Sequence, residues 1–387
     1  MTAGEALSSR DCPACHTAVP AAVFCGCCGA DLDRPADKWS ILLRPRVFAA
    51  APSEPITMPR VTSSLFPWLP RPARQPFRVA LVLLLLAMIA LSALRANGPL
   101  HAVSAIGGPA LFVLYMWQSD AFRDISHRAL WISWLTGAVT GVAWWLMAGR
   151  VVAGTYGVST AAGQALQNVL AGFALAVTIG GAVVMVLAPV VVRLLRVPVQ
   201  EPVDGYVIGA FGALSHTVAA NITWLFPQIV AGLLDTQSGW RMFADAITYG
   251  VIDPLTSVAV VGLVGLTLWF RPRERRYRKA LIVCVVATSI LYVVVWSIDA
   301  LALPYVIEVA TNLVLAALTL IVTRCGLQIV LLHERSGPVT EGPLLCVQCE
   351  AVVPDMPFCV SCGGSAQASS RSSRRLRREH PPVPELT

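Results

Sequence analysis

Long apolar stretches constrain this chain more than any other feature of its sequence. Of its 387 residues, 56% are hydrophobic and 13% are charged, and the mean hydropathy is +0.66. Soluble globular domains carry about 25% charged residues. The composition therefore excludes an ordinary soluble enzyme and predicts a multi-pass membrane protein whose first partner is the lipid bilayer.

Eight segments are long enough to cross the bilayer. A helix needs about 20 apolar residues to span about 30 Å of hydrocarbon. We expect membrane-spanning helices at 77–94, 100–117, 129–148, 168–192, 205–230, 246–270, 280–299 and 305–330. The weakly polar segment 150–167 fits a loop or a surface helix. The predicted fold class is an all-α membrane protein, with about eight transmembrane helices bundled over residues 77–330.

A four-cysteine pattern occurs near each end of the chain. Both copies read C-x2-C-x9-C-x2-C, and their ligands are Cys12, Cys15, Cys25 and Cys28, then Cys346, Cys349, Cys359 and Cys362. Two pairs of thiolates suit tetrahedral zinc. We therefore expect a zinc ribbon at 1–33 and another at 346–364, with two structural Zn²⁺ ions. Iron is the alternative metal, since four thiolates also suit it.

The cysteines and the basic residues predict the same orientation in the membrane. Free thiolates persist in reducing compartments, so both termini are expected in the cytoplasm and the number of spans should be even. Sixteen Arg and Lys residues flank the spans on the side expected to be cytoplasmic, against three, Arg95, Arg150 and Arg241, on the other. This bias follows the positive-inside rule and indicates the cytoplasmic (plasma) membrane.

The remaining segments have the composition of linkers and tails. Residues 34–76 contain nine prolines, which predicts an unpacked linker. Residues 331–345 form a second, short linker. The tail 365–387 is rich in arginine and serine and is predicted to be disordered, with attraction to anionic lipid as the alternative.

The ribbons are too small to bury a core, so their metal should supply the folding energy. Small ribbons of this kind act as binding modules. Neither ribbon has a Lys or Arg between its first and last cysteine, which argues against nucleic acid as a partner. A cytoplasmic or membrane protein partner, or pairing of the two ribbons, fits better.

Residues 200–224, QEPVDGYVIGAFGALSHTVAANITW, resemble the PrsW family of intramembrane metalloproteases. The matching positions are Glu201, Pro202, Asp204, Gly205, Gly209 and Asn221, and the resemblance covers about residues 160–300. It implies a helical membrane domain with a metalloendopeptidase ancestry.

This chain departs from the family at the positions that would carry catalysis. Gly180, Gly181 and Val184 stand in place of a Glu-Glu-x-x-Lys motif, and Ala220 stands in place of a Glu. Asp253 and Asp299 replace the two expected histidines. Because a catalytic zinc needs about three ligands and a general base, the resemblance implies a non-catalytic scaffold or regulator. The alternative is a membrane metalloendopeptidase with an altered active site.

Four ionisable residues in the predicted spans are the weak candidates for a functional site: His216, Asp253, Asp299 and Glu308. Charge inside a membrane is expensive, so these residues either converge on a relocated metal site or polar cavity, or have separate structural roles. In the second case Asp299 and Glu308 are solvated near the interface, Asp253 belongs to a Pro254 kink, and His216 bonds a neighbouring helix.

Tryptophans near the span ends are expected to form an aromatic belt.

Overall fold

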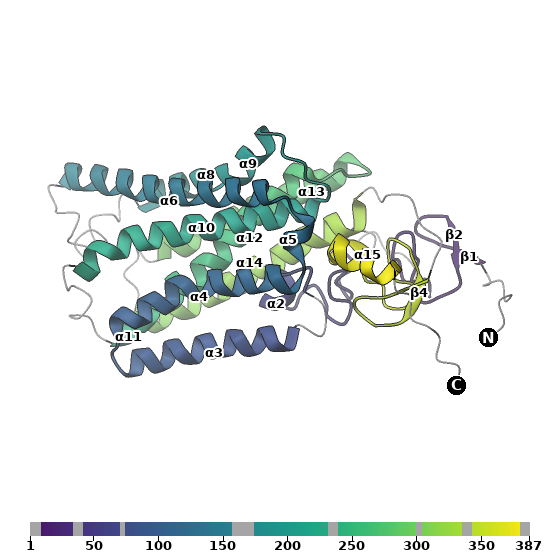
Figure 1. Cartoon of the computed structure of the whole chain (residues 1–387), viewed down its shortest axis with the longest axis horizontal. Coiled ribbons are helices and arrows are strands. Elements are labelled where there is room, and N and C mark those ends of the chain that lie inside the picture. Colours follow the sequence, from purple (N-terminus) through teal and green to yellow (C-terminus); the bar gives the residue numbers. More distant parts are fainter. Residues whose placement is uncertain are drawn as a thin grey trace.

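Long helices run side by side along the longest axis of the molecule, and a small head of loops and short strands covers one end (Figure 1). This computed structural model describes residues 9–33, 42–69, 74–156, 174–230, 239–298, 304–334 and 343–379. Both cysteine-rich segments lie in the head, although they come from opposite ends of the chain.

Within the described residues, every predicted span coincides with helix; residues 168–173 and 299 of the predicted spans lie outside them. The long helices are α3 (Arg74–Ala93), α4 (Asn97–Gln118), α6 (His127–Tyr156), α10 (Pro202–Val230), α13 (Arg275–Ile298) and α14 (Tyr305–His333). Two spans are composite. One is α8 (Ala174–Met185) followed by α9 (Leu187–Leu194), and the other is α11 (Gly239–Ile247), the π-helical turn η4 (Thr248–Ile252) and α12 (Asp253–Trp269).

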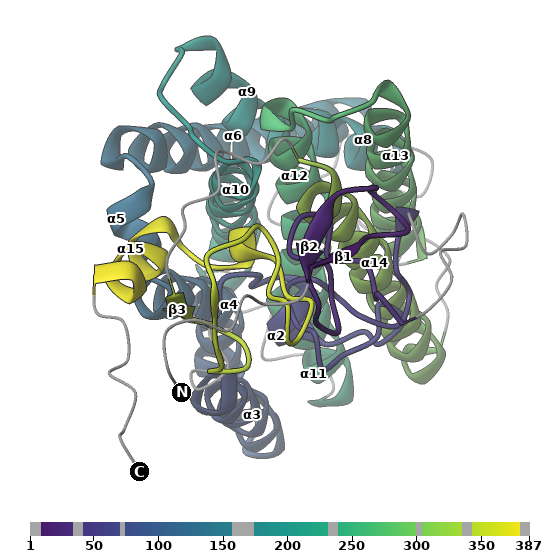
Figure 2. The same ribbon diagram turned by 90° about the vertical axis from the view of Figure 1, so that its right-hand side faces the viewer.

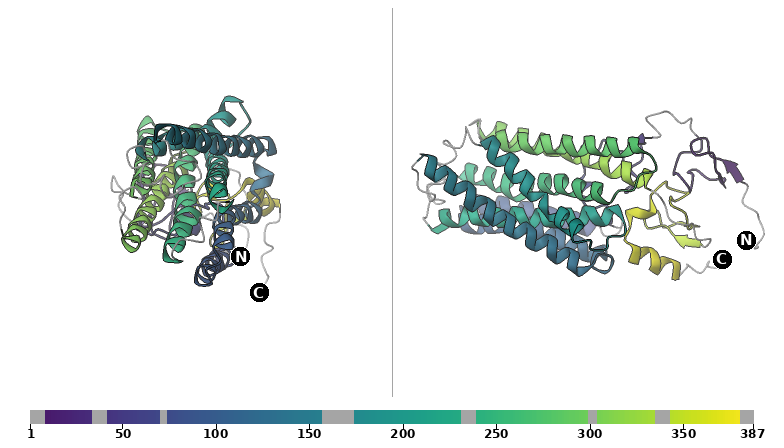
Figure 3. Two further views of the ribbon diagram at one scale, coloured as in Figure 1. Left: turned by 90° about the vertical axis from the view of Figure 1, so that its left-hand side faces the viewer. Right: turned by 90° about the horizontal axis from the view of Figure 1, so that it is seen from above.

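Seven of these helical segments, within the described residues, are long and apolar enough to cross a membrane. The eighth predicted span, α10, has 29 residues and is not among these seven; it carries the polar residues Asp204, His216 and Asn221. It packs between α6 and α12 in the interior of the bundle (Figure 3). A helix surrounded by other helices need not be as apolar as one that faces lipid. This explains why the sequence predicts eight spans whereas seven helical segments meet the length and apolarity required of a span.

Glycines allow α10 and α12 to approach closely. A Cβ atom added at Gly205 or Gly209 would overlap the backbone of Gly265 or Val261. This is the contact that small residues permit between membrane helices. The most apolar part of the α11–α12 span is 72% buried, against 11% for α3, so α12 is central and α3 peripheral.

The two ribbons have one fold. In the first, β1 (Ser9–Asp11) pairs antiparallel with β2 (Ala18–Pro20), and in the second β3 (Pro343–Leu345) pairs with β4 (Val352–Pro354). Adding 334 to a residue number of the first ribbon gives its equivalent in the second. The pairs Arg10↔Val19 and Leu344↔Val353 are related in this way.

The proline-rich segment is packed, contrary to its prediction as an unpacked linker. Among residues 42–69, the side chains of Phe48 and Leu69 are fully buried. Phe66 contacts the rings of Phe77 and Tyr115, with centroids 4.7 and 4.6 Å away. The short helix α2 (Val61–Ser64) also lies in this segment, between the head and the bundle.

Most of the basic tail is ordered as well, so its prediction as disordered is wrong for residues 365–379. A 3-10 turn, η6 (Ala366–Ala368), leads into α15 (Arg371–Glu379). The unassigned segment 150–167 is helical up to Tyr156 as part of α6. Its remainder lies outside the described residues.

Candidate metal centres

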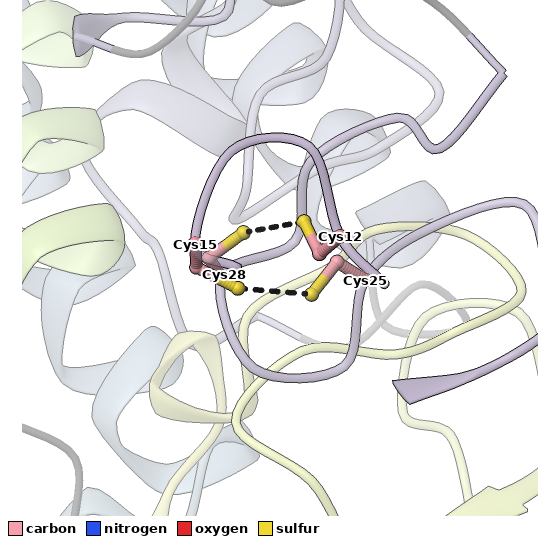
Figure 4. A group of neighbouring side chains, drawn as sticks. All are labelled: Cys12, Cys15, Cys25 and Cys28. Atoms are coloured by element: carbon pink, nitrogen blue, oxygen red, sulfur yellow. Dashed lines mark hydrogen bonds between the residues drawn. The ribbon is translucent and has the colours of Figure 1, made fainter. Parts of the chain in front are cut away.

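The first cysteine quartet is a compact cluster of four thiols (Figure 4). Two loops supply them: one follows β1 and the other follows Phe24. The sulfurs of Cys12 and Cys28 lie 3.7 Å apart, as do those of Cys15 and Cys25. Positive φ angles at His16 (56°) and Gly29 (67°) turn the backbone tightly beside each cysteine pair.

The second quartet repeats this geometry. The sulfur of Cys346 lies 3.8 Å from that of Cys362, and the sulfurs of Cys349 and Cys359 are also 3.8 Å apart. Glu350 and Gly363, with φ of 60° and 75°, take the places of His16 and Gly29. All four sulfurs of each quartet lie within 4.8 Å of one another.

These distances fit a metal ion held by four thiolates. A tetrahedral site with bonds of about 2.3 Å places its sulfurs about 3.8 Å apart. The neighbouring Cys28 thiol lowers the pKa of Cys25 to about 5, and the Cys359 and Cys362 thiols lower the pKa of Cys346 to about 2. The same hydrogen bonds raise the pKa values of Cys28 and Cys362, so each quartet shares its protons unequally, and metal binding would release the protons that remain.

The two ribbons pack on each other through reciprocal contacts. The Phe24 N–H donates to the Val360 carbonyl (3.0 Å), and the equivalent Phe358 N–H donates to the Gly26 carbonyl (2.9 Å). The Phe358 ring covers Gly29 and the Phe24 ring covers Gly363, so that an added Cβ at either glycine would clash. The head is thus a pseudo-twofold pair (Figure 2).

A buried ion pair joins the proline-rich segment to the bundle. Arg324 of α14 is fully buried and lies 3.2 Å from the Glu54 carboxylate. The same guanidinium donates to the Ser63 hydroxyl (3.0 Å) and to the Pro55 carbonyl (3.1 Å). It also lies over the Phe48 ring, 4.3 Å from its centroid.

Two further side chains join the proline-rich segment to its neighbours: Gln328 joins it to α14, and Arg74 of α3 joins it to the second ribbon. The Gln328 side chain accepts from the Ala49 N–H (2.7 Å) and donates to the Val47 carbonyl (3.0 Å). Arg74 donates to the Ala50 carbonyl (3.0 Å) and to the Gln348 side chain of the second ribbon (3.2 Å). The quartets are therefore held against the bundle by buried polar contacts.

Helix α15 covers the acidic start of α10. Arg371 lies 2.7 Å from the Asp204 carboxylate, and Arg374 pairs with Glu201. Burial raises the pKa of Glu201, and the Arg374 charge opposes this shift. The Asp124 carboxylate of α5 (Ala121–Asp124) accepts from the N–H groups of Arg371 and Ser372 and caps the N-terminus of α15.

Two of the four intramembrane candidates share a cavity. His216 of α10 and Asp253 of α12 are buried and both line it. Glu308, half-buried in the first turn of α14, does not line this cavity. Asp299 lies outside the described residues. Among the described residues, only the two cysteine quartets form a group of three or more side chains placed to bind a metal.

Sequence reasoning missed the aromatic walls of this cavity. Trp144 and Trp145 of α6 and Tyr292 and Trp296 of α13 line it, whereas the tryptophans were assigned to an aromatic belt. It also missed Thr140, whose hydroxyl lies 3.0 Å from Nδ1 of His216. The i, i+4 spacing of Tyr292 and Trp296 was the available signal, since it places both rings on one helix face.

Comparisons with protein-family models, with curated proteins and with solved structures gave no match to this chain.

Proposed function

We propose that this protein is a non-catalytic membrane scaffold or regulator whose paired zinc ribbons bind a cytoplasmic or membrane protein partner. The observation that carries the proposal is the joining of both cysteine quartets into one head. Arg74 links this head to the proline-rich segment, which Arg324 and Gln328 in turn link to α14. A rigid head on a membrane anchor suits binding better than catalysis.

Zinc is the metal we assign to both quartets. It favours tetrahedral thiolate sites and brings no redox chemistry. The sulfur spacing of 3.7–3.8 Å supports this assignment. Reducing conditions and the arginine bias of the flanking loops support a cytoplasmic head at the plasma membrane.

The PrsW-like part of the proposal is that the bundle keeps the family's framework without its chemistry. Glu201 and Asp204 pair with arginines of α15, so these carboxylates already have partners. His216 and Asp253 have no third ligand beside them among the described side chains.

A residual membrane metalloendopeptidase is the second candidate. The shared cavity of His216 and Asp253 favours it, because an imidazole and a carboxylate beside each other are part of a zinc site. Such a site would need a further ligand.

Metal analysis of the purified full-length protein separates the two candidates. The scaffold proposal expects about two zinc ions per chain, unchanged in His216→Ala and Asp253→Ala. It expects none when Cys12, Cys15, Cys346 and Cys349 are all changed to Ser. A further metal ion that disappears in His216→Ala would favour the enzyme, and absence of zinc from the unaltered protein would refute the ribbon assignment.

A further inference from the structure

A cavity of about 60 Å³ lies inside the bundle, between α6, α8, α10, α12 and α13. It has room for a few water molecules or for one small ligand group. Trp144, Trp145 and Trp296 in its wall are half-buried, so the cavity reaches the surface of the bundle. Its wall also holds Asp253, which is a costly residue to place there.

Asp253 is buried without a basic partner. Its carboxylate accepts a hydrogen bond from the Ser257 hydroxyl (3.1 Å), a neutral group. No Lys or Arg lines the cavity among the described residues. A buried carboxylate must be protonated or paired with a positive charge, and an ionisable residue inside a membrane bundle marks a functional site by default.

The side chains around Asp253 do not suit a metal ion. His216 is the other strong ligand in the wall, and its Nδ1 already contacts the Thr140 hydroxyl. Zinc needs about three protein ligands, and calcium takes six or more oxygens. The described residues bring no third strong ligand to this pair.

Aromatic rings make up much of the remaining wall. Tyr292 and Trp296 lie with centroids 6.4 Å apart on α13. Across the cavity, Trp145 packs against Trp224 at 5.1 Å, which fixes the position of its ring. The faces of such rings attract organic cations, and quaternary ammonium groups are bound by aromatic residues of this kind.

We propose that this cavity binds a small organic cation, an amine or quaternary ammonium group, with Asp253 as its counter-ion and the tryptophan and tyrosine rings as its walls. The proposal goes beyond the scaffold function and does not depend on the zinc ribbons. The cation is either a free molecule or the headgroup of a lipid, which present the same chemistry.

Isothermal titration of the full-length protein in a non-ionic detergent tests the charge requirement. Choline is the probe, and 3,3-dimethylbutan-1-ol, its neutral isostere, is the matched ligand control. We expect saturable choline binding and at least tenfold weaker binding of the alcohol. Methylamine is the second probe, for a primary amine. The proposal would be overturned if neither choline nor methylamine binds saturably, or if choline and the alcohol bind equally well.

Variants test the location of the site. Asp253→Asn should weaken choline binding at least tenfold, and Trp296→Leu should weaken it in a protein that keeps the carboxylate. Glu274→Gln, on an exposed loop, is the matched control and should bind normally. Each variant is accepted once its zinc content and elution volume match the parent protein. Normal binding by folded Asp253→Asn and Trp296→Leu would refute the site.

Nanodiscs distinguish the two sources of the cation. If a lipid headgroup is the ligand, phosphatidylcholine in a phosphatidylglycerol disc should compete with free choline and weaken its apparent binding to the parent protein. If the ligand is free, phosphatidylcholine should leave choline binding unchanged. Either pattern supports the cation site and identifies its source.

Discussion

At the scale of single residues, Arg324 and Glu54 show how this fold depends on buried charge. They are 270 positions apart in the chain and meet where α14 contacts the proline-rich segment. Both are almost fully buried. Glu54 also pairs with Arg60, 2.9 Å away, so it would keep one close positive charge if Arg324 were removed.

The first prediction concerns Arg324. Arg324→Ala should destabilise the protein by about 1.5–3 kcal/mol, because Glu54 would lose one charged hydrogen-bond partner and keep Arg60, which lies 2.9 Å away. The measurement is the apparent melting temperature in one detergent, which is monitored as the loss of the monodisperse elution peak on heating. Arg276→Ala is the control, since Arg276 pairs with Glu274 on the exposed surface. Equal melting temperatures for the two variants would contradict the prediction.

The second prediction concerns the pH dependence of the same ion pair. Burial alone would raise the pKa of Glu54. Hydrogen bonds from Ser63 and Arg60 and the charge of Arg324 lower it by a larger amount, so the pKa of Glu54 lies below its ordinary value. The folded state therefore holds this proton less tightly than the unfolded state. The ionised Glu54 carboxylate contributes its full stabilisation above the ordinary glutamate pKa of about 4.3. This stabilisation is lost as the pH falls through the lower pKa that Glu54 has in the folded state.

Melting temperatures of the parent protein and Glu54→Gln, measured from pH 7 to pH 3, check this sign. The parent should be more stable at pH 7, and the difference should narrow below about pH 4. Loss of zinc in acid affects both proteins alike and cancels in the difference. A difference that widens toward low pH would show that the shift has the opposite sign.

At the scale of elements, α15 is a tail helix held by side chains from two other helices. Asp124 caps its N-terminus, and Glu201 and Asp204 pair with its arginines. A helix of nine residues is too short to be stable alone, so these contacts hold it in place. Their loss should melt α15 while the bundle stays folded.

The third prediction is a charge exchange at this contact. Arg374→Glu should accelerate amide hydrogen exchange in α15 about tenfold or more, because like charges would then meet at a half-buried site. The double variant Glu201→Arg/Arg374→Glu should restore slow exchange. If the single variant exchanges at the parent rate, the ion pair does not hold the helix.

Sequence patterns predicted the elements well where one local property decides the structure. Apolar length located the helices, and cysteine spacing located both ribbons. The proline count was misleading for residues 42–69, because proline prevents regular structure but does not prevent burial. Their packing depends on Arg324 and Gln328, which are distant in the chain, and a single sequence gives no indication of such partners. The order of α15 was missed for the same reason, because its partners Asp124, Glu201 and Asp204 are also distant in the chain.

The polar cavity was half predictable. His216 and Asp253 stood out because ionisable residues are rare in membrane helices, and the structure places them at one cavity. Their aromatic neighbours could not be distinguished from interface tryptophans, since both occur near the ends of apolar segments. Only the packing of α6 against α10 and of α13 against α12 separates the two cases.

At the scale of the whole molecule, the fourth prediction is that the two metal sites are coupled. Phe358 covers Gly29 and its N–H donates to the Gly26 carbonyl, so unfolding one ribbon uncovers the other. If both quartets hold zinc as proposed, Cys359→Ser should remove the C-terminal ion and also accelerate the release of the N-terminal ion to a chelator.

Release of zinc to a chromogenic chelator measures this coupling. Cys284→Ser, in α13 and outside both quartets, is the control and should release both ions at the parent rate. A Cys359→Ser protein whose single remaining zinc leaves at the parent rate would show that the ribbons are independent.

The reciprocal contact between the ribbons also has a consequence for biosynthesis. The first ribbon leaves the ribosome more than 300 residues before the second, a delay on the order of 15–60 s at 5–20 residues per second. During that time the faces of Phe24 and Gly29 have no partner. The two ribbons can pair only after the second ribbon, which follows α14, has been made. A chain truncated before the second ribbon would therefore expose an apolar face of the first ribbon that the paired head hides.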